Sequence, residues 1–226
     1  MKACLVAGGA LEDAFLLECL QKEQYDITIA VDRGLDFFYR TGICPDYAVG
    51  DFDSASKETL SYFEAEAAAG RKAPELKCLN PMKDDTDTEH ALHMALQMNC
   101  DMIHIYGATG SRLDHVLGNL QLLGYGLRAG CECMLVDAHN RIRLIDRETV
   151  LRKKEQFGTY VSLIPYTPRV EGLTLEGFLY PLNDHTMSCF YLEDAARISG
   201  ISNEIIEDTA RINFTEGILV LVESRD

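Results

Sequence analysis

The sequence predicts an α/β fold in two parts: an N-terminal, doubly wound, mostly parallel α/β/α domain over residues 1–142, and a small antiparallel β-sandwich over residues 143–226. Short apolar runs alternate with amphipathic helical patterns up to about residue 140, and after that point the segments are short, β-rich and separated by Gly and Pro. The composition, 47% hydrophobic and 25% charged, is that of a globular chain. Strands that alternate with helices pair in parallel, which indicates a doubly wound sheet.

In the first part, apolar runs predict strands and periodic patterns predict helices. The strands are expected at 3–7, 27–31, 47–49, 76–79, 102–106 and 131–136, and the helices at 11–22, 35–40, 56–69, 88–98 and 115–128. The helix at 88–98 has the clearest period, since Leu92, Ala95 and Leu96 recur at helical spacing. Thr86 and Glu89 precede this period with the spacing of a capping box, which satisfies the first free amides of a helix.

In the second part, a basic stretch from Arg141 to Lys154 leads into segments with strand-like patterns. These segments are expected at 159–166, 173–180, 197–199 and 212–222. Their shortness and the turn residues between them predict antiparallel pairing.

The net charge of the chain argues against some classes of binding partner. The chain has 36 acidic and 21 basic residues and a formal charge of −15, and residues 1–140 hold 22 of the acids against 11 bases. Nucleic acids and anionic membranes need a basic face, so neither is expected as a partner. A small anionic ligand remains compatible with this charge, because a metal ion can mediate the contact.

Cysteine usage indicates the compartment. The eight cysteines form no CxxC motif, and most lie inside apolar runs, where a thiol acts as a small hydrophobic group. Reduced core thiols and the absence of a membrane-length apolar run predict a cytoplasmic protein.

Acidic residues follow four of the predicted strands. Asp32 follows the second strand, the pair Asp51 and Asp53 follows the third, Asp84 to Asp87 follow the fourth, and Asp114 follows the fifth. The carboxyl ends of parallel strands meet at one edge of a sheet, where ligands bind. Gathered carboxylates repel one another unless a cation is present, and Mg²⁺ prefers oxygen ligands and phosphates.

Each of these motifs is ambiguous when taken alone. In extended chain Asp51 and Asp53 face the same side and could reach one metal ion, but Asp is also common in solvated turns and at helix starts. Lys83 suits a phosphate or simply balances its acidic neighbours. The turn that carries Arg112 lacks the P-loop and Rossmann spacings. The Gly8-Gly9 turn suits either a phosphate or ordinary tight packing.

Two other chemistries are disfavoured. His90 and His93 share a predicted helix face, but catalytic zinc sites use three protein ligands. No G-x-S-x-G motif is present, which argues against a serine hydrolase of that type.

Taken in order, the motifs resemble the thiamine pyrophosphokinase family, whose enzymes move pyrophosphate from ATP to thiamine. The resemblance runs from about residue 3 to 222 and rests on residues 30–34 (AVDRG), 45–54 (PDYAVGDFDS), 83–92 (KDDTDTEHAL), 110–115 (GSRLDH) with Asn119, 177–182 (GFLYPL) and 200–204 (GISNE). It implies an α/β nucleotide-binding domain followed by a thiamine-binding β-sandwich, in a homodimer with the active site at the subunit interface.

The resemblance also implies roles for individual residues, with Mg²⁺ as the metal and ATP as co-substrate. The catalytic set is Asp51, Asp53, Asp84 and Asp87. The first three bind the metal or its waters, and Asp87 either joins them or orients thiamine. The nucleotide side is formed by Asp32, Lys83, Arg112, Asp114, His115 and Asn119. The thiamine side is formed by Asp87, Ser202 and Asn203.

The chain departs from the family pattern in three places. The family commonly has Asp-Gly-Gly where this chain has Asp32-Arg33-Gly34, so Arg33 stands in place of the first of the two glycines, and its role is open. The chain has no Trp, so any stacking on the thiazolium must come from Tyr or Phe. The family match makes Asp85 the variable residue between Asp84 and Asp87.

Two alternatives remain at this point. One is a non-catalytic regulator that binds thiamine or a nucleotide on the same fold. The other is a phosphatase that uses Asp51 as a nucleophile.

Overall fold

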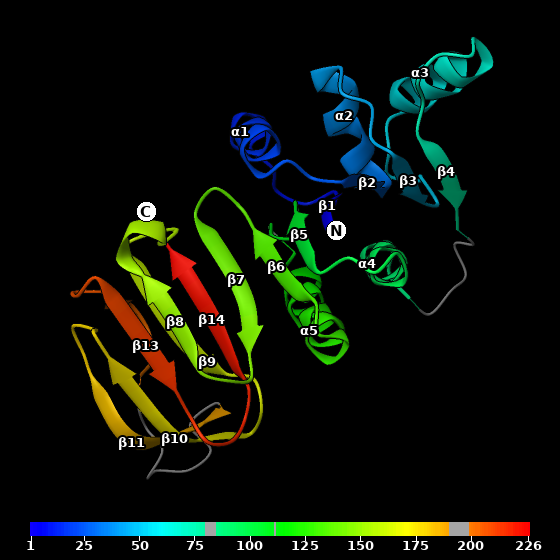
Figure 1. The fold of residues 1–226 in the computed structure, drawn as a ribbon. Helices are drawn as coiled ribbons and strands as arrows, with labels where there is room; N and C mark the ends of the chain where they lie inside the picture. The colour runs from blue at the N-terminus through cyan, green and yellow to red at the C-terminus, as the bar shows by residue number, and fades with distance from the viewer. Residues whose placement is uncertain (80–84, 111, 190–198) are drawn as a thin grey trace. The chain divides into compact units, whose positions relative to one another are not determined.

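The computed structural model describes residues 1–79, 85–110, 112–189 and 199–226 (Figure 1). The chain forms two compact units, Met1–Ala138 and His139–Asp226.

The first unit is built on a parallel sheet with the strand order β6-β5-β1-β2-β3-β4. The strands are β1 (Lys2–Val6), β2 (Ile27–Val31), β3 (Tyr47–Gly50), β4 (Glu75–Cys78), β5 (Met102–Tyr106) and β6 (Glu132–Val136). The central strand β1 has no exposed surface from Ala3 to Val6. Burial on both faces explains why the inner strands are continuous apolar runs, whereas the edge strand β4 is exposed along its length. The predicted bounds of all six strands agree with the structure to within one residue.

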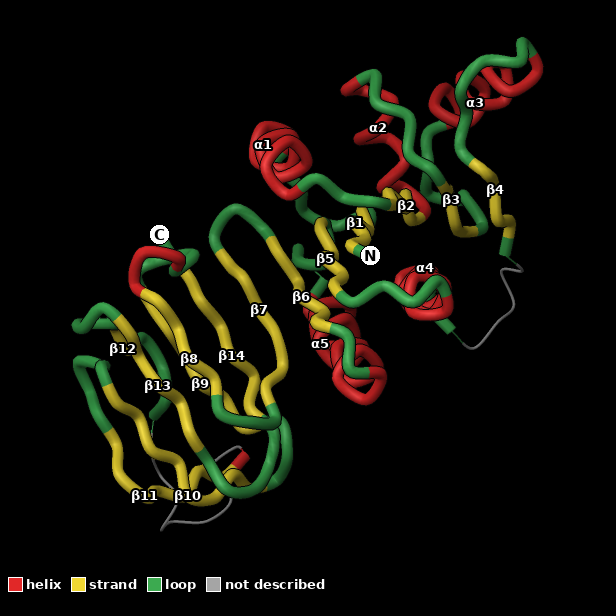
Figure 2. The backbone as a smooth tube through the Cα atoms, viewed as in Figure 1, coloured by secondary structure: helices red, strands yellow, loops and turns green. Residues whose placement is uncertain are grey.

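Helices cover both faces of this sheet. They are α1 (Asp13–Glu23), α2 (Leu35–Thr41), α3 (Lys57–Ala68), α4 (Asp87–Gln97) and α5 (Leu113–Ala129). The first three lie on one face and α4 and α5 on the other (Figures 1 and 2). The chain runs outward from β1 to β4 and then returns to the other side of β1, so right-handed crossovers reverse the face. Among the described residues, no helix is both long enough and apolar enough to cross a membrane.

This reversal makes a topological switch point between β1 and β5, the neighbouring strands from which the chain leaves in opposite directions. In open α/β sheets, ligands bind beyond the carboxyl ends of the strands at such a point. Ligand-binding residues are therefore expected in the loops that follow β1, β2, β3 and β5.

The start of α4 confirms half of the predicted capping box. The Thr86 side chain accepts a hydrogen bond from the Glu89 N–H at 3.2 Å. The Glu89 carboxylate accepts one from the Tyr125 hydroxyl at 2.8 Å. Glu89 therefore links α4 to α5.

The second unit is an antiparallel β-sandwich, as predicted. One sheet has the order β12-β9-β14-β7 and the other β11-β10-β13-β8. The strands are β7 (Asn140–Ile145), β8 (Thr149–Arg152), β9 (Tyr160–Pro165), β10 (Arg169–Glu176), β11 (Leu182–Ser188), β12 (Asn203–Glu204), β13 (Thr209–Asn213) and β14 (Leu219–Ser224). The two sheets share one core, with Val161 and Leu221 in one sheet and Leu173 and Ile212 in the other.

The sequence located the strands of this unit less well. The single segment expected at 212–222 is two strands, β13 and β14, and the segment expected at 173–180 begins earlier, as β10. Nearly all of the segment expected at 197–199 lies outside the described residues. The basic stretch contains β7 and β8, which were not predicted because charged side chains interrupt their apolar pattern.

An ion pair explains one of those charges. Arg141 in β7 lies opposite Glu223 in β14, and its guanidinium donates two hydrogen bonds to that carboxylate at 2.9 and 2.7 Å. Glu223 is only 1% exposed and also accepts the Phe157 N–H at 3.2 Å. Opposite charges on facing strands stabilise an antiparallel pair.

All eight cysteines are free thiols in the structure. Half of them, Cys4, Cys100, Cys131 and Cys133, are buried. Burial raises the pKa of the Cys100 thiol, so this buried group stays protonated and packs as an apolar side chain.

Gly34 sets how closely the loop after β2 approaches β1. It ends η1 (Asp32–Gly34), and a Cβ added there would lie 1.8 Å from the Val6 carbonyl oxygen. We expect Gly34→Ala to lower the free energy of unfolding by about 1–3 kcal/mol through overpacking. Urea unfolding followed by circular dichroism measures this change.

Gly118 in α5 is the matched control, because a Cβ there meets nothing within 4 Å. Gly118→Ala should stabilise the protein by roughly 0.5–1 kcal/mol, as expected for an exposed helix position. A Gly34→Ala protein as stable as the wild type would contradict this description of the packing.

Candidate functional site

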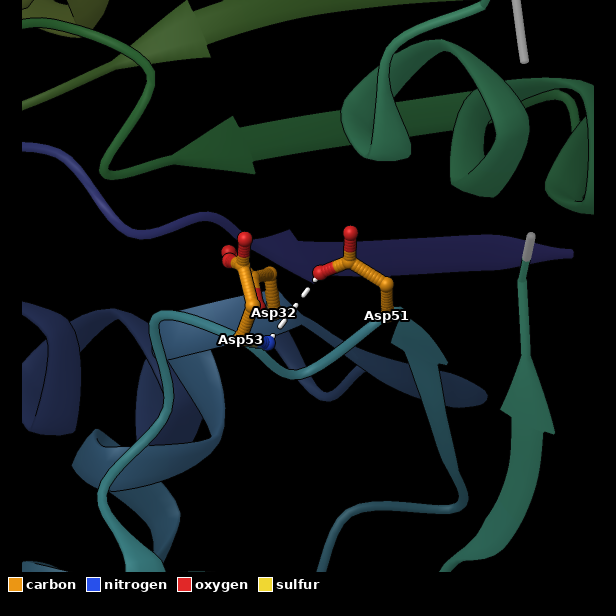
Figure 3. Close-up of side chains that lie close together, drawn as sticks. All are labelled: Asp32, Asp51 and Asp53. Carbon is orange, nitrogen blue, oxygen red and sulfur yellow. Dashed lines mark hydrogen bonds between the residues drawn. The ribbon is translucent and has the colours of Figure 1, made fainter. Parts of the chain in front are cut away.

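Three carboxylates converge at the carboxyl edge of the parallel sheet. Asp32 comes from η1 after β2, while Asp51 and Asp53 come from the loop after β3. Their ligand oxygens all lie within 4.8 Å of one another (Figure 3). The Asp53 N–H donates to Asp51 Oδ1 at 3.1 Å. The structure thus brings together acids from two strand ends that are separate in the sequence.

The backbone around these acids is held in uncommon conformations. Asp32 and Phe52 have φ values of 50° and 59°, in the left-handed region that non-glycine residues seldom adopt. A Cβ on Gly50 would lie 3.1 to 3.2 Å from atoms of Asp32, so this glycine permits the close approach of the two loops. Phe52 is 8% exposed and anchors the loop between the two acids. Such strain is typical of functional sites.

The surroundings of Asp32 disfavour the charged form of its carboxyl group. Burial raises the pKa of Asp32, and the charges of Asp87, Asp51 and Asp53 raise this pKa further, against a hydrogen bond from the Ser54 hydroxyl that lowers it. Asp32 Oδ1 is buried and has no hydrogen-bond partner in the described part of the chain. An orphaned carboxylate oxygen among other acids fits a hard cation with oxygen ligands. Asp87, at the start of α4, contributes to the same negative field.

Asp36 holds the acidic loop against the following helix. Its carboxylate accepts a hydrogen bond from the Ser56 N–H at 3.2 Å and another from the Thr59 hydroxyl at 2.5 Å. Ser56 caps α3 by accepting the Thr59 N–H at 3.1 Å. The sequence analysis missed Asp36 and Ser54, although the N-cap spacing of Ser56 and Thr59 was a readable signal of an anchored helix start.

A second group of candidate residues lies at the start of α5. Arg112 and Asp114 form an ion pair at 2.6 Å, with side chains 71% and 66% exposed. Arg112 lowers the pKa of Asp114 to about 2. His115 is exposed beside them, and the Asn119 amide donates to the Ala108 carbonyl at 2.8 Å. Asn119 therefore fixes the loop after β5, while the other three side chains face solvent.

The glycine turn after β1 packs tightly on that same loop. The Gly9 N–H donates to the Gly107 carbonyl and the Ala10 N–H to the Thr109 carbonyl, both at 2.7 Å. A Cβ on Gly9 would lie 2.3 Å from the Thr109 carbonyl oxygen. Because these amides are already used, the structure favours the tight-turn interpretation over a backbone phosphate cradle.

In the second unit, Asn203 is engaged with the neighbouring chain. This residue is 8% exposed. Its Oδ1 accepts the N–H groups of Tyr180 and Glu204 at 3.0 and 2.9 Å, and its Nδ2 donates to the Tyr180 carbonyl at 2.9 Å. Ser202 beside it is exposed, with a left-handed φ of 58°.

An apolar pocket of about 70 Å³ lies next to these residues, with Phe178, Tyr180 and Asn203 in its lining. The Tyr180 side chain is 64% exposed. This aromatic group is therefore available to stack on a planar ligand.

The remaining residues singled out in the sequence either lie outside the described residues or lie away from the acid cluster. Lys83 and Asp84 lie outside the described residues. His93 packs on the Tyr125 ring at 4.5 Å between centroids, and its Nε2 lies 3.9 Å from Glu89. Within the described ranges the acid cluster is the one group arranged to hold a metal ion, so the structure gives no support to a zinc site at His90 and His93.

Comparison with known families gives two matches along the chain. Residues 20–135 match the catalytic domain of thiamin pyrophosphokinase. Residues 148–219 match the vitamin B1 binding domain of the same family. Each match lies wholly within one of the two compact units.

Individual relatives agree with these matches. The chain is similar to a thiamine pyrophosphokinase of Bacillus subtilis, with 35% identity over 204 residues that cover 90% of each protein. It is also similar to the crystal structure of thiamine pyrophosphokinase from Bacillus subtilis, with a TM-score of 0.83, 34% identity and full coverage of both chains. The structure from Geobacillus thermodenitrificans matches with a TM-score of 0.81 and 31% identity, over 100% of this chain and 98% of that one.

The electrostatic imbalance predicts that Asp32→Asn stabilises the metal-free protein at neutral pH. A raised pKa means that the folded state binds this proton more tightly than the unfolded chain does, so stability falls as the pH rises through the folded-state pKa. Asn removes the charge, and the free energy of unfolding in EDTA at pH 7 should increase by roughly 0.5–2 kcal/mol. This gain in the free energy of unfolding should shrink as the pH is lowered toward 3.8, the ordinary pKa of Asp.

Urea titrations at several pH values measure this difference. Asp36→Asn is the matched control and should lose stability, because its carboxylate accepts two hydrogen bonds. A destabilised Asp32→Asn protein at pH 7 would rule out the proposed imbalance.

Proposed function

The chain belongs to the thiamin pyrophosphokinase family, and from this premise we propose how its residues carry out the reaction of a thiamine diphosphokinase. That reaction transfers a pyrophosphoryl group to the hydroxyl of thiamine. In our proposal ATP is the donor, and thiamine diphosphate and AMP are the products. The observation that carries the assignment of the site is the convergence of Asp32, Asp51 and Asp53 at the carboxyl edge of the sheet.

The proposed chemistry is a direct displacement. The thiamine hydroxyl oxygen attacks the β-phosphorus of ATP and loses its proton to solvent, and the bond from that phosphorus to the α,β-bridging oxygen breaks. AMP leaves with the electron pair. Transfers of this kind depend chiefly on positioning and on neutralisation of charge, rather than on a nucleophile of the protein.

The metal-binding role is proposed for Asp51, Asp53 and Asp84, with Mg²⁺ as the ion. The crowding of carboxylate oxygens and the unpartnered Oδ1 of Asp32 support a cation at this edge. The chemistry that Mg²⁺ supplies when bound is neutralisation of charge on the phosphate oxygens. The protein's own contribution is that Gly50 lets the loop with Asp51 and Asp53 approach Asp32 closely.

The nucleotide side is proposed to involve Asp32 and the exposed start of α5. Lys83 and Arg112 are the donors to phosphate oxygens, and the other residues of this side are Asp32, Asp114, His115 and Asn119. The Asn119 hydrogen bond to Ala108 supports the loop on which the start of α5 rests. The ion pair of Arg112 with Asp114 is exposed, so a phosphate can compete for this guanidinium at small cost.

The thiamine side is proposed to involve Ser202 and Asn203, together with Asp87. Tyr180 and Glu204 occupy most of the Asn203 amide and leave one of its N–H bonds for a ligand. Thiamine is a cation, so the negative field around Asp87 favours its binding. We further propose a cytoplasmic homodimer in which the second unit of one subunit completes the site of the other.

We expect Asp53→Asn to lower the rate of thiamine-dependent AMP formation at least 100-fold, because it removes a charged ligand that stabilises the transition state. Its thermal unfolding midpoint should stay close to that of the wild type. Released AMP and thiamine diphosphate are quantified by chromatography at saturating Mg²⁺.

The matched control is Asp85→Asn, which changes an exposed acid next to the motif and should keep activity within about twofold. Full turnover by Asp53→Asn would exclude the metal-ligand assignment. A wild-type protein that binds ATP and thiamine but forms no AMP would be a regulator, and an aspartyl-phosphate trapped at Asp51 would indicate a phosphatase.

The proposed interface predicts that two inactive variants complement each other. Asp53→Asn damages the first unit, and Ser202→Trp blocks the thiamine side of the second. If each site uses one unit from each subunit, mixed dimers contain one intact site, and a mixture recovers up to about a quarter of the wild-type activity.

Activity is measured after subunit exchange, which co-purification of two differently tagged variants verifies. Lack of recovery despite exchange would show that each site lies within one chain. Activity of either variant alone would show that the substituted residue is dispensable.

A further inference from the structure

A hollow of about 210 Å³ lies in the first unit, between the loop after β1 and the segment that joins β2 to α2. Its lining includes residues 7–11 of the loop and the charged residues Arg33, Asp36 and Arg40. The hollow thus lies at the carboxyl end of β1, one of the two strands of the topological switch point.

The charged side chains of this hollow differ in how many hydrogen bonds they already make within the protein. Arg40 donates to both carboxylate oxygens of Asp13, at 3.0 and 2.7 Å. Asp36 accepts hydrogen bonds from Ser56 and Thr59. Arg33 is exposed and makes no hydrogen bond or ion pair with any residue in the described ranges. The cation available to a ligand in this hollow is therefore Arg33.

The base of the Arg33 side chain is nevertheless fixed. A Cβ on Gly8 would lie 2.9 Å from the Cβ of Arg33, so the arginine stem stands directly against the glycine loop. The next residue, Gly34, packs on the Val6 carbonyl, and the preceding residue, Asp32, belongs to the acid cluster. The Arg33 side chain therefore starts from a packed backbone position that directly follows an acid of the cluster.

The chemistry of the lining indicates the kind of ligand. The amides of Gly9 and Ala10 already donate to the loop after β5, so the backbone supplies little positive charge. A polyphosphate placed near Asp32, Asp51 and Asp53 is repelled by them unless cations offset the carboxylates. The planar guanidinium binds phosphate oxygens through paired hydrogen bonds, and Arg33 is the group here that can do so.

We propose that Arg33 is a positioning residue that binds phosphate oxygens of the nucleotide in the hollow between the β1 loop and α2. The proposal rests on the proposed function, in that it takes ATP as the donor. It gives a role to the position at which this chain departs from the Asp-Gly-Gly pattern.

The test compares Arg33→Ala and Arg33→Lys with Lys72→Ala, which removes an exposed cation elsewhere in the same unit. Calorimetry in EDTA measures the affinity for α,β-methylene-ATP, which has no cleavable bond at the reacting position. Steady-state kinetics with Mg²⁺ measure the KM values of ATP and thiamine separately. Circular dichroism melts verify that each variant is folded.

We expect Arg33→Ala to weaken analogue binding and raise the KM of ATP about tenfold, which corresponds to about 1.4 kcal/mol. The KM of thiamine should stay within twofold of the wild type. Arg33→Lys keeps the positive charge but lacks the paired N–H donors of the guanidinium, so it should recover part of the lost affinity. Lys72→Ala should bind the analogue as tightly as the wild type and have the same KM of ATP.

Analogue affinity and ATP KM within twofold of the wild type in Arg33→Ala would overturn the proposal. An equal loss in Lys72→Ala would also overturn it, because the effect would then come from overall charge. If Arg33→Ala loses analogue binding while the wild type forms no thiamine diphosphate, the phosphate site stands and the proposed function fails. If Arg33→Ala binds the analogue as tightly as the wild type while the wild type forms thiamine diphosphate, the proposed function stands and the role of Arg33 fails.

Discussion

The crowding of carboxylates at the edge of the parallel sheet is the constraint on which the first unit depends. Asp32, Asp51 and Asp53 keep their oxygens within 4.8 Å of one another, with a buried oxygen of Asp32 left unpartnered in the described chain. Like charges at this distance oppose folding, and burial makes that opposition stronger. The arrangement persists because the carboxyl ends of β2 and β3, from which these loops leave, are buried and leave the loops little freedom. A bound cation would relieve the repulsion, so the cost is tied directly to function.

Close backbone contacts between neighbouring loops hold the acids in place. Gly34 seats η1 on the carbonyl of Val6, and Gly50 lets the end of β3 approach Asp32. Asp36 fixes the start of α3, and the amides of Gly9 and Ala10 join the β1 loop to the β5 loop. The loops that follow neighbouring strands therefore hold one another in position. The three carboxylates are thus positioned by groups outside the acid cluster.

In the second unit, too, buried groups support exposed side chains. Asn203 uses its buried amide to hold the backbone of Tyr180, which leaves the Tyr180 ring and Ser202 exposed beside an apolar pocket. The ion pair of Arg141 with Glu223 joins two strands of one sheet. Hydrogen bonds between buried polar groups favour one arrangement of the chain. In our proposal, thiamine binds against these exposed groups of the second unit, while the acids of the first unit bind the metal and the phosphates.

The sequence by itself determined the α/β strands of the first unit, the acids at their ends and the cap of α4. These features are local: strands buried on both faces are continuous apolar runs, and a cap is set by residues three apart. Only the tertiary structure decided that Asp32 meets Asp51 and Asp53, that Glu89 bonds to Tyr125, and that Arg141 belongs to a strand because Glu223 lies opposite it. These pairings join residues far apart in the chain. Their energies depend on close packing around glycines and on burial, neither of which leaves a periodic trace in the sequence.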